Sequence, residues 1–462
     1  MRKLLLMPVV LLALTGITNA QNSGSIDAKT LSEIRTSFKK DASTQAIQNA
    51  ITNSESIREL SLNRSKIGKT DHYFKYRVDV KGITDQHSSG RCWMFTSMNT
   101  IRPNVMKKFN LNAFDFSHNY NYFWDMFEKS NLFLENIIAT ADRNMDDREV
   151  VSYFKSPVND GGVWNSFYNL AKKYGVVPAK VMPETKASNK TREIGSLLNE
   201  KLRGEGYKLR ILAAEKASAK KMKAAKVEAL KSIYRMLALS LGEPPVKFEW
   251  RFKDSKGNIS ESKTYTPLQF LEEIAPAYAD LEMVMIMNDP TREYYKVYEI
   301  KNYRNVSEGI NWTYLNLPNE DIKKFALASI KNNEAMYASC DVGKQHNRKA
   351  GVMDMNTYDY ASLLGVEFDM DKKARILTRQ SGSSHAMALI GVDVDENEKP
   401  VKWEFENSWG SGSGNKGYLT FTDEWFDAYM FRVVINKKYL DEKAKIASES
   451  KPVQLPVWDY MF

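Results

Sequence analysis

The 462-residue sequence predicts an α+β protein, and three observations support this. After Cys92, apolar residues recur every three or four positions, as in a helix buried on one side. The run 386–394 is almost continuously apolar, as in a strand buried on both faces. Residues 401–407 alternate between apolar and polar, as in a strand with one buried face. The helical stripe consists of Met94, Met98, Ile101, Val105 and Phe109.

Residues 1–20 have the pattern of an export signal. Arg2 and Lys3 precede an apolar run from Leu4 to Leu14, and small residues lead up to an expected cut after Ala20. The run is too short to span a bilayer comfortably, so a membrane anchor is the less favoured alternative. We therefore expect an exported protein, periplasmic or secreted, with no membrane span once the signal is removed.

The composition indicates a globular protein with a sizeable core, since 43% of the residues are hydrophobic and 11% aromatic. The net charge of +9 is spread along the chain, and its densest basic run is Lys216 to Lys231. Such runs are usually solvated helix faces, although nucleic-acid binding is an alternative. The sequence contains no metal-ligand spacing, phosphate loop or dinucleotide fingerprint, so we expect neither a metal nor a cofactor.

The first part of the chain is predicted to be mainly helical. Residues 21–70 form a polar N-terminal arm laid on the surface, and residues 71–187 form a helical lobe that carries Cys92. The aromatic stretch 114–127 is a second helix, and paired glycines make a turn at 159–164. A further helix over 164–174 ends at Gly175.

The middle of the chain, residues 188–330, is predicted to be an insertion. Ala, Lys, Glu and Leu dominate up to Leu241, which favours helices, and Gly242 ends that segment. Residues 246–263 alternate around a turn at 254–257, as in a hairpin. Residues 331–450 form a β-rich lobe, with a further strand at 417–421 and a helical turn at 422–429, and residues 451–462 form a C-terminal arm.

Cys92 is a candidate nucleophile. A cysteine in the first turn of a helix lies near unpaired backbone N–H groups and the positive end of the helix dipole, which favour thiolate. The alternative is a buried structural cysteine. Cys340 is the only other cysteine, and we expect it to be buried in a strand. A Cys92–Cys340 disulfide would consume the nucleophile and is left open at this point.

His385 and Asn407 are candidates for the base and for the group that orients it. His385 begins the apolar run 386–394 after the flexible segment 381–384, which places an imidazole at the edge of a cleft. Asn407 continues the expected buried face of the next strand. A nucleophilic cysteine needs both kinds of group, together with donors for an oxyanion.

Three motifs resemble those of papain-like cysteine proteases. They are Gln86 followed by Ser89-Gly-Arg-Cys-Trp93, the pair of glycines in Asn159-Asp-Gly-Gly162, and Asn407-Ser-Trp-Gly410. Further segments are similar to the bleomycin hydrolase and aminopeptidase C branch of that family. These are Cys340-Asp-Val-Gly-Lys344, Thr422-Asp-Glu-Trp-Phe426 and Leu455-Pro-Val-Trp-Asp459.

The resemblance implies a papain-like fold with two lobes, a cleft between them and a large helical insertion. It also implies roles for individual residues. Cys92 is the nucleophile, His385 its base and later acid, Asn407 the orienting residue, and Gln86 an oxyanion donor beside the Cys92 N–H group. Trp409 shields the bond between His385 and Asn407. The substrate-binding residues implied are Trp93, Gly161, Gly162 and Phe462.

The same resemblance implies an aminopeptidase that acts on peptides and assembles as a homohexamer through the insertion. The chain ends at Tyr460-Met-Phe462, which is shorter than the usual ending of this branch, so an endopeptidase with a more open cleft is the alternative. A catalytically silent binding protein is the alternative from another class.

Overall fold

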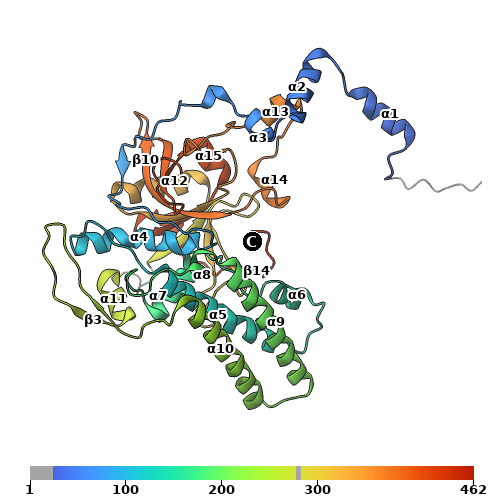
Figure 1. Ribbon diagram of the computed structural model, residues 1–462. Coiled ribbons are helices and arrows are strands. Elements are labelled where there is room, and N and C mark those ends of the chain that lie inside the picture. The colour runs from blue at the N-terminus through green and yellow to red at the C-terminus, as the bar shows by residue number, and fades with distance from the viewer. Residues whose placement is uncertain (1–23, 277–281, 462) are drawn as a thin grey trace, which may run out of the picture.

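The computed structural model describes residues 24–276 and 282–461. The expected export signal at 1–20 and the expected substrate-binding residue Phe462 lie outside the described residues. Figure 1 shows a sheet with β10 in the upper part of the molecule and a group of helices in the lower part. Helix α4 (Cys92–Lys108) runs between them. The predicted α+β class is therefore confirmed.

The helical part is built on α4, α5 (His118–Ala139) and α7 (Trp164–Tyr174). Helix α4 buries Met94, Met98, Ile101 and Val105, as its spacing predicts, and Phe109 caps its end. The second helix begins at His118 rather than near 114, because Ser117 caps it by accepting from the Tyr120 N–H group. Helix α7 has the predicted bounds.

Gly175 ends α7 for two structural reasons. Its φ is +71°, and an added Cβ would lie 2.2 Å from the backbone of Pro267, at the start of α11 (Pro267–Ile274). A side chain is excluded at this position both by the backbone conformation and by the close approach of α11.

The range expected to be an insertion contains two kinds of structure. Helices α9 (Arg192–Ala214) and α10 (Ala219–Leu241) pack on α5, and the hairpin of β2 (Phe248–Trp250) and β3 (Lys263–Tyr265) forms as predicted. The remainder contains β4 (Met283–Met287), β5 (Lys296–Ile300) and β6 (Thr313–Asn316), which belong to the main sheet, and α12 (Asn319–Lys331). The sequence did not predict these three strands.

The main sheet has twelve strands within the described residues, and its order is β14-β5-β6-β4-β13-β7-β10-β11-β12-β9-β8, with β1 also paired to β10. The central strands β7, β10 and β13 run antiparallel to their neighbours. The predicted buried strand is β10. The bounds not yet given are β1 Tyr76–Arg77, β7 Met336–Cys340, β8 His346–Asn347, β9 Val352–Met353, β10 His385–Val394, β11 Pro400–Glu406, β12 Tyr418–Thr422, β13 Met430–Asn436 and β14 Val453–Leu455.

Strand β11 differs from the prediction of one exposed face. Val401 is exposed, whereas the charged residues Lys402, Glu404 and Glu406 are all buried. Each has an ion-pair partner from elsewhere in the chain: Asp71, Arg77 and Arg102, respectively. Pairing lowers the cost of burying a charge, so alternation of residue type did not produce alternation of burial.

The N-terminal arm leaves the surface instead of lying along it (Figure 1). Helices α1 (Ala28–Ser37) and α2 (Ala42–Thr52) have no buried residue, and Phe38 is 52% exposed. The arm joins the body from α3 (Ile57–Leu60) onward, where Arg58 donates to the carbonyl oxygen of His346 at 2.8 Å and Lys66 pairs with Asp354 at 3.2 Å. The remaining helices are α6 Arg148–Lys155, α8 Lys186–Asn189, α13 Tyr360–Leu364, α14 Lys372–Leu377, α15 Asp423–Tyr429 and α16 Glu442–Ser448.

Helix α10 carries much of the basic run. It buries Met222 and Ala229 on one side, and Lys226 and Lys231 pair with Glu135 and Glu228. This is the arrangement of a solvated helix face, while nucleic-acid binding stays an untested alternative. Within the described part of the chain, no helix is both long enough and apolar enough to cross a membrane.

Candidate active site

The nucleophile loop, residues 85–92, is held against the segment 159–162. The Gly90 N–H group donates to Oδ2 of Asp160 at 2.6 Å, and the Thr191 hydroxyl donates to the same oxygen. An added Cβ on Gly90 would lie 2.4 Å from Oδ1 of Asp160. A side chain at position 90 would displace the Asp160 carboxylate, because that carboxylate packs directly on the Gly90 backbone.

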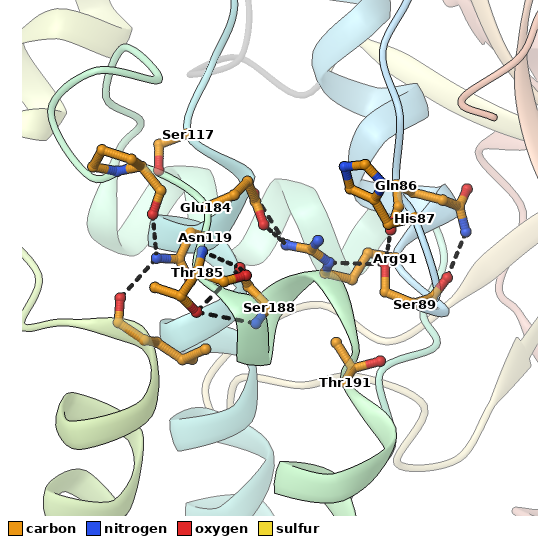
Figure 2. A network of polar contacts seen from close by, with 12 residues as sticks. Gln86, His87, Ser89, Arg91, Ser117, Asn119, Glu184, Thr185, Ser188 and Thr191 are labelled. Atoms are coloured by element: carbon orange, nitrogen blue, oxygen red, sulfur yellow. Dashed lines mark hydrogen bonds and ion pairs between the residues drawn. The ribbon is translucent and has the colours of Figure 1, made fainter. Parts of the chain in front are cut away.

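Arg91 also fixes this loop, through contacts with Ser89 and Glu184 (Figure 2). Its side chain is fully buried, and Nη1 lies 2.9 Å from Oε2 of Glu184. Its Nε donates to the Ser89 hydroxyl at 3.0 Å, and that hydroxyl donates to the Gln86 carbonyl oxygen at 2.6 Å. The loop that presents Cys92 is thus ordered by charge-assisted hydrogen bonds.

A cleft of about 1210 Å³ lies between the helical part and the sheet. Its walls bring together most of the residues expected to carry the chemistry. These are Gln86, Cys92, Trp93, Gly161, Gly162, His385 and Trp409. Cys92 is the first residue of α4 and His385 the first of β10, so each reactive group stands at the end of a regular element.

Asn407 lies behind His385, at the end of β11. Nε2 of His385 and Oδ1 of Asn407 are 2.8 Å apart, and both side chains are buried. The same amide oxygen accepts from the Ser408 N–H group at 2.8 Å, which fixes its orientation. The Trp409 ring is centred 4.6 Å from the imidazole and covers this pair on one side. The imidazole is therefore held in one orientation.

Burial dominates the acid–base properties of both reactive groups. It raises the pKa of the Cys92 thiol to about 11, despite the helix N-terminus that favours thiolate, and the Ala386 and Trp93 N–H groups offset this only in part. Burial also lowers the pKa of His385 to about 4, against the opposing effect of Asn407. Each charge is costly alone, whereas transfer of the thiol proton to His385 creates two opposite charges that stabilise each other.

The low pKa of His385 gives a prediction for Asn407→Asp. A carboxylate beside the imidazole favours the imidazolium form, so the pKa of His385 rises. As the pH is lowered, His385 is then protonated at a higher pH and can no longer act as a base. We expect the acidic limb of kcat/KM to move up by roughly one to three pH units. A pH profile of peptide hydrolysis measures this, and an unmoved acidic limb would contradict the assignment of His385 as the base.

Gln86 is oriented by the motif that contains Asn407. The Ser408 hydroxyl donates to Oε1 of Gln86 at 2.6 Å, and the Gln86 N–H group donates to the Ser408 carbonyl oxygen at 2.8 Å. With Oε1 occupied in this way, the Nε2 group is the donor end; one of its hydrogens goes to the Ser89 carbonyl oxygen at 2.6 Å. Gln86 and the Cys92 N–H group thus stand on the nucleophile's side of the cleft, where an oxyanion donor is needed.

Trp93 supports the two glycines expected to bind substrate. Its Nε1 donates to the Asp160 carbonyl oxygen at 2.9 Å, and an added Cβ on Gly162 would lie 2.6 Å from the indole ring. The Lys129 ammonium donates to the Gly161 carbonyl oxygen at 2.6 Å. The segment is therefore a fixed wall of the cleft, with Trp93 behind it.

The C-terminal tail reaches the cleft. Met461 is buried and forms part of the cleft wall together with Cys92 and His385. Cys340 is buried at the end of β7, as predicted, and both cysteines are free, so the disulfide alternative is wrong.

Sequence reasoning gave no role to several residues of the site. Arg91, Asp160 and Ser408 lie inside the motifs, where position alone was a usable signal. Arg432 also lines the cleft, and its signal was a lone charge in the apolar strand β13.

Comparisons with known proteins identify relatives of this chain. A family model described as the Peptidase C1-like family matches residues 25–462. Aminopeptidase C from Lactobacillus delbrueckii subsp. lactis is 37% identical over 445 residues, covering 95% of this chain and 98% of the relative. Bleomycin hydrolase from Mus musculus is 36% identical over 450 residues, covering 95% and 99%.

A solved structure, PepW from Lactobacillus rhamnosis, has a TM-score of 0.91 at 37% sequence identity and covers 95% of this chain and 99% of its own. The papain-like fold expected from the sequence is confirmed. The chain therefore belongs to the Peptidase C1-like family, and it is a papain-like cysteine peptidase of the aminopeptidase C and bleomycin hydrolase type.

Proposed function

We propose that this protein is an aminopeptidase that cleaves peptides through Cys92, His385 and Asn407. The thiol proton passes to His385, and the thiolate attacks the carbonyl carbon of the first peptide bond. The Cys92 N–H group and Gln86 Nε2 stabilise the oxyanion, and His385 then protonates the leaving amine. His385 next takes a proton from water, which attacks the acyl-enzyme and releases the N-terminal residue. Asn407 keeps the imidazole oriented through both steps.

The position of Met461 carries the proposal of exopeptidase action. Met461 lines the cleft together with Cys92 and His385, so the tail takes up space that substrate residues upstream of the cleaved bond would need. A peptide with a free N-terminus fits such a site better than a chain that continues in both directions. The names of the two relatives, aminopeptidase C and bleomycin hydrolase, support the same proposal.

The test compares peptides with free and acetylated N-termini but otherwise identical sequence. We expect the purified enzyme to cleave the free peptides one residue at a time and the acetylated peptides far more slowly. Equal rates on both would establish the endopeptidase alternative. No cleavage of either, with no labelling by an epoxide inhibitor of cysteine peptidases, would instead support a silent binding protein.

The homohexamer and the export of the protein stay predictions. The exposed apolar residues of the arm, among them Ile34 and Phe38, are consistent with self-association. Light scattering of the full chain would measure the mass, and a monomer would contradict the predicted assembly.

A further inference from the structure

Arg432 is a buried cation for which the described residues supply no acid. It lies on β13, is 5% exposed, and has no carboxylate within ion-pair distance in residues 24–276 and 282–461. Its guanidinium stands 3.9 Å above the Trp312 ring, and its Nε is buried without a hydrogen-bond partner among these described residues. Burial lowers its pKa. A charge kept in such a position is costly, which points to a function.

The strand register places Arg432 on the wall of the active-site cleft. Ala386 on β10 pairs with Ser339 on β7, and Ser339 pairs with Arg432 on β13. Residues paired in this way share one face of a sheet, and all three line the cleft. The Ala386 N–H group faces the Cys92 sulfur, so Arg432 lies two strands, about 10 Å, from the reaction centre.

Arg432 also contacts the tail. Its Nη2 donates to the Met461 carbonyl oxygen at 3.2 Å. The Met461 N–H group donates to Oδ1 of Asp459 at 3.1 Å, and Asp459 forms an ion pair with Arg292. Arg292 in turn donates to the Tyr314 hydroxyl at 2.7 Å. The last described residues are therefore fixed to the sheet by two arginines, and only Arg432 acts from within the cleft.

We infer that Arg432 is the positioning residue that holds the tail across the upstream end of the cleft and so limits the enzyme to the N-terminal residue of its substrates. This inference rests on the proposed aminopeptidase function. The guanidinium holds a backbone carbonyl, so it fixes the path of the tail whatever side chain stands at position 461. Without it, the tail leaves the upstream end open, and a longer substrate enters.

Arg432→Met tests the inference, because methionine keeps much of the apolar stem and removes the donors. We expect the ratio of kcat/KM for acetylated to free peptides to rise about tenfold, the equivalent of one hydrogen bond from a charged donor. The enzyme concentration is taken from titration of Cys92 with an epoxide inhibitor, so that only folded, competent enzyme is counted. Arg432→Lys, which keeps a charged donor, should stay closer to the unchanged enzyme.

Arg210→Met is the matched control. Arg210 on α9 also donates to a backbone carbonyl oxygen, that of Thr140 at 2.9 Å, and it does not line the cleft. The control should leave the ratio unchanged. A second measurement places Arg432→Met in a chain that lacks residues 459–462. If Arg432 acts through the tail, the substitution adds nothing there.

The inference is wrong if Arg432→Met keeps a fully titratable Cys92 and its ratio of kcat/KM for acetylated to free peptides is unchanged. It is also wrong if Arg432→Met raises that ratio as much in the shortened chain as in the full chain. Neither result would affect the proposed function, which is tested on the unchanged enzyme: equal cleavage of acetylated and free peptides, or no cleavage of either, would contradict it.

Discussion

Cys92→Ala is expected to lower kcat/KM for free peptides by at least about 10⁴-fold. Removing the nucleophile leaves only binding and the oxyanion donors, and the comparable loss in other covalent peptidases is of this size or larger. Because α4 begins at this residue and no side chain among the described residues forms a hydrogen bond with the Cys92 thiol, the fold should survive the change. Circular dichroism checks the fold, and a fluorogenic peptide assay measures the loss.

Cys340→Ala is the control for this experiment. Cys340 is the other cysteine, equally free but buried in β7, next to His385 in the sheet register. This variant should keep its activity and should still be labelled once by an epoxide inhibitor, whereas Cys92→Ala should not be labelled. Persistent hydrolysis in Cys92→Ala, or loss of labelling in Cys340→Ala alone, would show that Cys92 is not the nucleophile.

Arg102→Met is expected to give a large loss of stability. Arg102 projects from α4, and its Nη2 lies 2.5 Å from Oε1 of Glu406, at the end of β11 beside Asn407. Both side chains are almost fully buried. Removing the arginine leaves a buried carboxylate without its partner, which costs about 3–5 kcal/mol of unfolding free energy. Urea unfolding at pH 8 measures it.

The loss should depend on pH. Burial already raises the pKa of Glu406 to about 7 with Arg102 present, and removal of Arg102 raises it further. The folded state then holds a proton that the unfolded carboxyl, with its ordinary pKa near 4.3, releases. Stability is therefore regained as the pH falls below the folded pKa and is lost as it rises through it. The double variant Arg102→Met/Glu406→Gln should recover much of the loss at pH 8; if it does not, the unpaired charge is not the cause.

Local patterns predicted the elements that carry the chemistry. The stripe after Cys92, the apolar run after His385 and the glycine at 175 each describe one element, and each element formed with nearly the predicted bounds. The short strands β4, β5 and β6 could not be predicted in this way. Each has only four or five residues, and their place in the sheet depends on pairing with strands far along the chain.

Burial of charge was the other property that the sequence could not supply. The partner of Glu406 is Arg102, 304 positions earlier, and the sequence does not show this pairing. The alternation in β11 therefore predicted an exposed face that the structure does not have. The same limit applies to Cys92. A helix N-terminus is visible in sequence, but the enclosure that raises the pKa of its thiol depends on the whole cleft.

Asp160 joins two parts of the site that a substrate meets together. Its carboxylate holds Gly90 in the nucleophile loop, and its own carbonyl oxygen holds Trp93, behind the Gly161–Gly162 segment. The surface that aligns the peptide and the surface that attacks it are therefore ordered before any substrate arrives. Binding then needs little further loss of conformational entropy on this side of the cleft, and more of the binding free energy remains for aligning the scissile bond.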